Sequence, residues 1–147
     1  MNLVRLMYAS RMAKGVDPDG LTRILDASKR NNAALGVTGV LCYSPAGFLQ
    51  VLEGPPEAVN ELYRRIVRDR RNEEATLLAY AETSRRRFPE WSMAYFRGDG
   101  IDRALLRGLT SEKAFDPMAM TAAEALRFLT AVATERRRFL QQSAGDE

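Results

Sequence analysis

The sequence contains no histidine and a single cysteine, Cys42, and both facts exclude classes of chemistry. Without histidine, Ser–His and Cys–His nucleophilic catalysis are excluded, and a zinc or iron site is not expected. One cysteine cannot form an internal disulfide. Because Cys42 lies in an apolar segment, we expect it to pack as a small hydrophobic side chain.

Long apolar runs are also missing, so no segment is expected to span a membrane. The N-terminus lacks the basic region, apolar stretch and small-residue cleavage site of a secretion signal. We therefore expect a cytoplasmic protein with no membrane partner. The 147 residues, 46% of them hydrophobic, are enough for one domain with a substantial core.

The basic excess is small, with a formal net charge of +3, but it is clustered along the chain. Arginines gather in three places, at residues 64–71, 85–87 and 136–138. Such clusters fit either solvated faces and loops or a site for phosphate-bearing ligands or nucleic acid. We favour the solvated interpretation and do not expect a nucleic-acid partner.

Hydrophobic periodicity predicts an α+β fold with the element order βαββαββ over the first 97 residues. The expected elements are a strand over 2–9, a helix from 17–18 to about 31–32, strands over 37–43 and 47–54, a helix from 55–56 to about 71–72, and strands over 75–83 and 90–97. Two crossover helices can cover only one face of such a sheet, which is the ferredoxin-like arrangement. In the last strand, alternation predicts that Trp91, Met93 and Tyr95 share a face.

The other face of the sheet needs its own cover, because Leu3, Met7, Leu49 and Val51 are expected to point there. Residues 98–147 can supply it as a helical extension of the 1–97 domain. A short helix is predicted over 102–109 and a longer one over 121–140. A capping box, in which Thr121 and Glu124 bond each other's backbone, marks the start of the longer helix.

The most informative stretch is 47–54, in which Gln50 lies on the same strand face as the apolar Phe48 and Leu52. A buried amide without partners costs about 1–3 kcal/mol, so either protein groups or a ligand must satisfy it. Tyr8 is expected on the same sheet face, and Asn32 at the end of the first helix above it. Together these side chains could bind each other and a polar heterocycle between the two helices.

At these positions the chain resembles the BLUF family of blue-light sensors, which use a flavin. The matching segments contain Leu-Met-Tyr8-Ala-Ser, the block from Asn31-Asn32 to Val-Thr-Gly-Val-Leu, Phe-Leu-Gln50-Val-Leu-Glu-Gly, and Arg-Arg-Phe-Pro-Glu-Trp91-Ser-Met93. They occur in the family's order and spacing over residues 2–97. The resemblance implies the ferredoxin-like fold, with the flavin held between the two helices.

The resemblance also implies roles for individual residues. Tyr8 matches the tyrosine that gives an electron and a proton toward the excited flavin, and Gln50 matches the glutamine between this tyrosine and the flavin N5/O4 edge. Trp91 and Met93 match the pair whose position responds to signalling. The other implied flavin contacts are Asn32 at the O4/N3 edge, Asn31 beside it, Ile24 and Ile66 on the ring faces, and Ser28, Asp69 and Arg71 near the ring edge and ribityl chain.

The function implied is a photoreceptor rather than an enzyme, with noncovalent FAD as cofactor and FMN or riboflavin as the alternatives. No output enzyme or DNA-binding motif is recognisable after residue 98. We therefore expect the signal to leave through the last strand and the C-terminal helices. The expected partners are a second copy of the chain, as a homodimer or larger homo-oligomer, and a separate downstream protein.

Three other functions are compatible with the predicted fold. An RNA-binding module would need exposed aromatic side chains on the central strands, where Phe48 is the only aromatic in the 47–54 stretch. A small acyl- or phosphotransfer enzyme would need a phosphate cradle, and no Gly-rich loop supplies one. A ligand-free interaction domain would leave Tyr8, Gln50 and Asn32 as core polar groups bonded only to protein.

Overall fold

The computed structural model describes residues 2–98, 108–109 and 114–145 of the chain. Its elements are β1 (Leu3–Met12), α1 (Pro18–Leu35), β2 (Thr38–Ser44), β3 (Gly47–Gly54), α2 (Pro56–Arg68), β4 (Asn72–Thr83), β5 (Ala94–Arg97), the 3-10 turn η2 (Pro117–Ala119) and α4 (Ala122–Gly145). The first seven elements confirm the predicted βαββαββ order.

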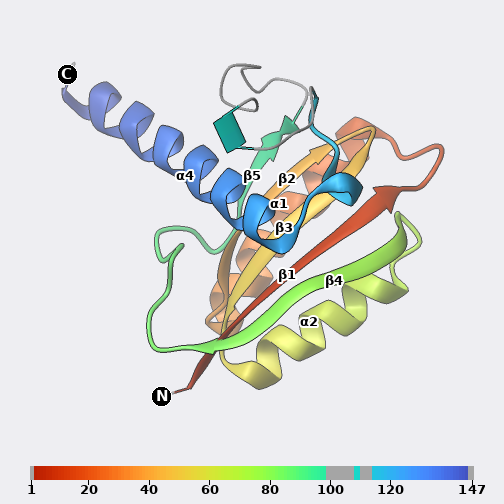
Figure 1. Cartoon of the computed structure of the whole chain (residues 1–147), viewed down its shortest axis with the longest axis horizontal. Helices are drawn as coiled ribbons and strands as arrows, with labels where there is room; N and C mark the ends of the chain where they lie inside the picture. Colours follow the sequence, from red (N-terminus) through yellow and green to blue (C-terminus); the bar gives the residue numbers. More distant parts are fainter. Residues whose placement is uncertain (1, 99–107, 110–113, 146–147) are drawn as a thin grey trace.

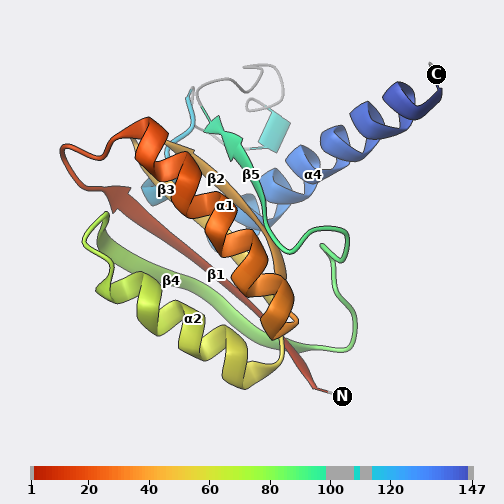
Figure 2. The ribbon, with the colours of Figure 1, turned by 180° about the vertical axis from the view of Figure 1, so that it is seen from behind.

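One five-stranded sheet organises the molecule, with strand order β4-β1-β3-β2-β5 (Figure 1). The pairings β1–β3, β1–β4 and β2–β3 are antiparallel, and β5 joins β2 in parallel. Helices α1 and α2 lie on one face, and α4 crosses the opposite face, as Figure 2 shows from behind. This arrangement confirms the ferredoxin-like fold and places the C-terminal helix on the face that the first two helices leave uncovered.

The sheet separates two apolar cores, and the alternation along β3 explains why. Phe48 and Leu52 belong to the core under α1 and α2, together with Leu6 and Tyr8 of β1. Leu49 and Val51 belong to the core under α4, together with Met7. Because every residue of β3 is buried, this central strand places one set of side chains in each core.

Two helix starts follow the capping chemistry that the sequence predicts. The carboxylate of Asp17 accepts a bond from the backbone N–H of Gly20 at 3.3 Å, ahead of α1. At α4, the Thr121 hydroxyl accepts from the N–H of Glu124 at 3.1 Å. The Glu124 carboxylate accepts from the N–H of Thr121 at 3.0 Å, which completes the capping box.

The predicted ends of the first two helices are wrong. α1 continues to Leu35, past the predicted end, whereas α2 ends at Arg68, before it. The early end of α2 has a local cause: the backbone at Asp69 is extended, and the carbonyl of Ile66 accepts from the backbone N–H of Asp69 at 3.1 Å and from the side chain of Asn72 at 3.2 Å. The helix predicted over 102–109 falls almost wholly outside the described residues.

The last strand is the main correction, because β5 begins at Ala94 rather than at residue 90. Residues 84–93 form a connection whose N–H groups are partly bound by a side chain of β3, so they do not pair as a regular strand. As a result Trp91 and Met93 do not share a face. Met93 lies in the core under α1 and α2 with Tyr95 packed against that core, whereas Trp91 packs against the core under α4.

Candidate functional site

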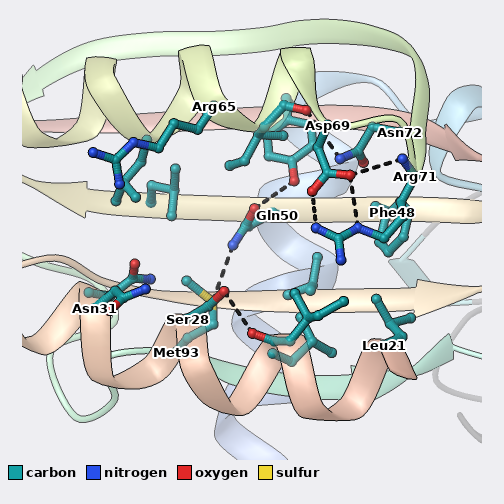
Figure 3. Close-up of a pocket in the computed structure, with 18 residues that line it drawn as sticks. Leu21, Ser28, Asn31, Phe48, Gln50, Arg65, Asp69, Arg71, Asn72 and Met93 are labelled. Atoms are coloured by element: carbon teal, nitrogen blue, oxygen red, sulfur yellow. Dashed lines mark hydrogen bonds and ion pairs between the residues drawn. The ribbon is translucent and has the colours of Figure 1, made fainter. Parts of the chain in front are cut away.

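A cavity of about 200 Å³ opens between α1 and α2, with β1 and β3 as its floor (Figure 3). Residues far apart in the sequence meet here because the two crossover helices run over the same sheet face. Gln50 projects from the middle of β3 into this space, between the side chains of the two helices.

Three buried side chains form a chain of contacts across the cavity floor. The Tyr8 hydroxyl donates to Gln50 Oε1 at 2.6 Å, and Gln50 Nε2 donates to the sulfur of Met93 at 3.4 Å. Tyr8 and Gln50 are directly opposite each other in the β1–β3 pairing. Oxygen and nitrogen of the amide therefore have different partners, which fixes the amide in one orientation.

Burial determines the protonation of Tyr8. Desolvation raises the pKa of this phenol far above its ordinary value, and the nearby phenol of Tyr63 and the carboxylate of Asp69 raise it further. The ring of Tyr63 lies 5.5 Å from that of Tyr8. Tyr8 is consequently a neutral phenol across the physiological pH range, and loss of an electron from it would be accompanied by loss of its proton.

The walls of the cavity are apolar. Ile24 of α1 and Ile66 of α2 both line it, with Leu25 and Leu62 beside them. Ile24 is 36% exposed, which is unusual for a large aliphatic side chain on the core-facing stripe of a helix. A flat apolar ring between the helices would cover it, so these walls fit the faces of an aromatic heterocycle.

Amide and hydroxyl groups lie along the α1 side of the cavity. Asn32 is buried and donates one N–H to the carbonyl of Ser92 at 3.2 Å, next to Met93. Asn31 also lines the cavity but is exposed. The Ser28 hydroxyl donates to the carbonyl of Ile24 at 3.0 Å within α1. An amide such as Asn32 offers both a donor and an acceptor to the edge of a ligand.

A charged pair lies at the other end, just after α2. The guanidinium of Arg71 forms an ion pair with the carboxylate of Asp69, and its Nε donates to Asp69 Oδ1 at 2.8 Å. These bonds hold the pKa of Asp69 below and that of Arg71 above their ordinary values. Both side chains remain charged at neutral pH and present a polar rim.

All the side chains predicted to contact a flavin line this one cavity, and so does Met93. Trp91 does not line it. Its ring lies on the α4 side, where the guanidinium of Arg137 is 5.7 Å from the ring centre. Sequence reasoning missed several lining residues, namely Leu21, Leu25, Leu41, Leu62, Arg65 and Asn72. Leu21 and Leu25 share the stripe of Ile24, so helical spacing could have identified them.

The described part of the chain has no group of three His, Cys, Asp or Glu side chains that could hold a metal ion. Nor does any helix in those residues have the length and apolar character needed to cross a bilayer.

The fold, the buried Tyr8–Gln50 pair and the cavity between two helices define a small α+β domain whose cavity has the shape and polarity to fit a planar heterocycle. The family model described as "Sensors of blue-light using FAD" matches residues 3–94. The chain therefore belongs to the BLUF family.

Among solved structures, the dark state of BlrB, a BLUF protein, is 32% identical with a TM-score of 0.74, and the match covers 91% of this chain and 97% of that one. The photo-activated state of BlsA is 29% identical with a TM-score of 0.79, covering 90% and 95%. The similarity to these two structures extends beyond the family model to most of the chain.

Curated relatives share only part of their length with this chain. The blue light- and temperature-regulated antirepressor BluF of Escherichia coli is 31% identical over 94 residues, which are 64% of this chain and 23% of that protein. A photoactivated adenylate cyclase subunit beta of Euglena gracilis is 35% identical over 92 residues, 62% of this chain and 11% of that protein. The chain thus corresponds to a minor part of these relatives.

Proposed function

We propose that this protein is a blue-light photoreceptor that binds FAD noncovalently between α1 and α2. The observation that carries the proposal is the buried hydrogen bond of 2.6 Å from Tyr8 to Gln50 on the floor of the cavity. A fixed amide beside a neutral phenol is the arrangement that a light-driven hydrogen-bond switch requires. The family description supports FAD as the flavin; FMN and riboflavin are the other flavins that analysis of the bound cofactor would identify.

The residues around the cavity fit a flavin. Ile24 and Ile66 would contact the two faces of the isoalloxazine ring, and Gln50 and Asn32 would bind its polar edge. The remaining proposed contacts, near the ring edge and ribityl chain, are Asn31, Ser28, Asp69 and Arg71. When bound, the flavin supplies absorption of blue light and an excited state that accepts an electron.

The protein's own part in the response would begin with Tyr8, which would give an electron to the bound flavin and its hydroxyl proton to Oε1 of Gln50, while Gln50 would release a proton from Nε2 toward the flavin. Return of the electron and one proton to Tyr8 would leave Gln50 as its rotated or tautomeric amide, with a stronger bond to flavin O4. One or two buried hydrogen bonds are worth about 1–3 kcal/mol in total. A free-energy difference of that size is enough to shift the populations of two output states that are nearly equal in free energy.

The signal would leave through residues 84–93 and β5. Met93 contacts Gln50 directly, and two residues earlier Trp91 lies on the opposite face of the sheet, against the α4 core. Arg137 of α4 donates to the carbonyl of Arg87 at 3.2 Å and pairs with Glu90 at 2.8 Å. This segment therefore contacts both the cavity and α4, which makes it suitable to couple them.

We further propose that the output is an interaction rather than catalysis by this chain. A change in α4 would alter association with a second copy or with a separate downstream protein. The adenylate cyclase and antirepressor activities for which the relatives are named belong to those proteins, which are much longer than the matched segment. Localisation in the cytoplasm stays a prediction from the sequence.

Absorption spectroscopy of the purified protein tests the proposal. We expect a yellow protein that releases FAD on denaturation and shows a small, reversible red shift after blue light. A yellow protein without a shift would refute the switch and leave a flavin-binding protein. A colourless protein that takes up no added flavin would refute flavin binding as well.

A further inference from the structure

We propose that Glu53 is a positioning residue for the light response: its buried carboxylate holds the start of the β4–β5 connection so that Met93 stays against Gln50. The inference rests on the proposed function, since the effect it predicts is on the photocycle. Glu53 does not line the cavity and would not touch the flavin.

The carboxylate of Glu53 is fully buried and has three protein partners. Its Oε1 accepts from the backbone N–H groups of Arg87 at 2.9 Å and Phe88 at 2.7 Å. Its Oε2 also accepts from the N–H of Arg87 at 2.9 Å and from Nε of Arg5 at 2.9 Å. Glu53 has no accessible surface, so these bonds are shielded from competing water.

Side chains of the connection itself, Arg86 and Phe88, also attach it to the sheet. The guanidinium of Arg86 donates to the hydroxyl of Thr38 at 2.9 Å, to the carbonyl of Glu53 at 3.0 Å and to that of Gly36 at 2.7 Å. Phe88 is itself fully buried in the α4 core. Residues 86–88 are thus bound to the end of β3 and to the segment that leads into β2.

The far end of the connection has attachments of its own and leads into the β2–β5 ladder, where Ala94 pairs with Val40. The carbonyl of Trp91 accepts from the N–H of Gly39 at 3.1 Å, and that of Ser92 from Asn32 at 3.2 Å. Met93 then meets Gln50 through a thioether sulfur, which is a weak acceptor. Such a contact cannot position a loop by itself, so the place of Met93 depends on the backbone that carries it.

Glu53 and Gln50 lie on one central strand, three residues apart, which corresponds to about 10 Å along it. The strand is paired on both sides over this length, with β1 and with β2. It therefore sets the distance between the loop attachment and the amide. Loosening the attachment should let Met93, which also lines the cavity, move relative to Gln50.

A purely structural role for Glu53 would be to neutralise Arg5, and two variants separate the roles. Glu53→Asp keeps the negative charge but withdraws the carboxylate by about one C–C bond, roughly 1.5 Å, from the loop N–H groups. Arg5→Gln removes the cation and leaves those N–H groups bound to the carboxylate. Positioning predicts an effect on the photocycle from Glu53→Asp and none from Arg5→Gln, whereas charge neutralisation predicts the reverse.

The closing experiment is a double-mutant cycle on the flavin-loaded full chain. Dark recovery after blue light is measured for wild type, Glu53→Gln, Met93→Leu and the double variant, with Glu53→Asp replacing Glu53→Gln if the latter does not fold. Loss of one or two hydrogen bonds predicts recovery about three- to tenfold faster for the Glu53 variant. In the Met93→Leu background, where the sulfur is absent, the same change should alter recovery by less than about twofold.

The outcomes separate this inference from the proposed function. The positioning role would be overturned if the Glu53 variant changed the rate of dark recovery equally in the wild-type and Met93→Leu backgrounds. It would also be overturned if the variant lowered thermal stability and left the rate of dark recovery unchanged. A wild type without any light-induced shift would instead refute the proposed function. Hydrogen exchange in the dark tests the attachment without photochemistry: the Arg87 and Phe88 amides should exchange faster in the Glu53 variant, and unchanged exchange would overturn the inference.

Discussion

The hydroxyl of Tyr8 donates to Oε1 of Gln50 over 2.6 Å, and the two residues face each other across the β1–β3 pairing. Because Met93 accepts from the amide nitrogen of the same residue, rotation of the amide would break both contacts at once. In the structure Oε1 is directed at the phenol, and the rotated amide is the second state that the proposed switch requires.

Replacing Gln50 by leucine should leave the flavin bound and abolish the light-induced spectral shift. Leucine is similar in volume and lies between Phe48 and Leu52 on an apolar face, so we expect the fold to persist. The variant cannot bridge Tyr8 and the flavin. Visible absorption before and after blue light measures the effect, and a wild-type shift in this variant would exclude Gln50 as the switch.

Asn32→Ala should weaken flavin binding about five- to a hundredfold, because it removes a buried amide that donates to the Ser92 carbonyl and that we propose to bind the ring edge. Asn31→Ala is the matched control, since Asn31 is adjacent in α1 but exposed. Its effect on affinity should be clearly smaller. Titration of flavin-free protein gives both values, and equal affinities for Asn32→Ala and wild type would contradict the assignment.

Arg137→Gln should leave the spectral shift intact and reduce the light-dependent change in α4. The side chain contacts the Arg87 carbonyl, the Glu90 carboxylate and the Trp91 ring, all in the 84–93 connection. Arg136→Gln is the comparison variant, because Arg136 lies over Phe96 of β5 and tests contact with that strand separately from contact with the 84–93 connection. Light-dependent hydrogen exchange along α4 measures the coupling. Equal loss in both variants would argue against a specific role for Arg137.

Deleting residues 101–147 should spare the photochemistry and damage solubility or assembly. The deletion removes α4 and exposes the sheet face that includes Met7, Val40 and Leu49, all of which are buried in the intact chain. The cavity lies on the opposite face. Spectra and light scattering of the truncated protein check both parts, and loss of the spectral shift from soluble truncated protein would contradict the division into sensor and extension.

Strong periodicity made most of the fold predictable. The alternation in 47–54 assigned Phe48 and Leu52 to one core and Leu49 and Val51 to the other, as observed. The capping residues at Asp17 and Thr121 were equally clear, because their bonds are local. Sequence patterns are reliable where short-range geometry determines the outcome.

The connection 84–93 was not predictable, because its conformation depends on a distant side chain. Alternation suggested a strand from residue 90, but Glu53 binds the N–H groups of Arg87 and Phe88 from 34 and 35 residues away. In α4, helical spacing predicts a core-facing stripe of Ala122, Leu126, Leu129 and Ala133; Leu129 and Ala133 are fully buried, whereas Ala122 and Leu126 are only partly buried. Ala125, Phe128 and Val132 are buried as well, so the face of α4 that packs on the sheet is wider than that stripe.

For the site, the residues whose place follows from strand register were predictable, namely Tyr8 and Gln50. Once the two strands are correctly placed, alternation puts both side chains on the same sheet face, and the two residues pair directly in the β1–β3 ladder. Arg65 and Asn72 line the cavity without such a signal. Arg65 looked like part of a solvated arginine cluster, and Asn72 followed a helix end that the structure places four residues earlier, at Arg68.

The most direct test of the switch is the light-minus-dark absorption spectrum of wild type beside Tyr8→Phe. The substitution removes one oxygen from a buried ring and leaves the cavity walls in place. We predict that both proteins are yellow, that wild type shows a small red shift reversing in the dark, and that Tyr8→Phe shows none. A reversible shift of wild-type size in Tyr8→Phe would contradict the assignment of Tyr8 as the electron and proton donor.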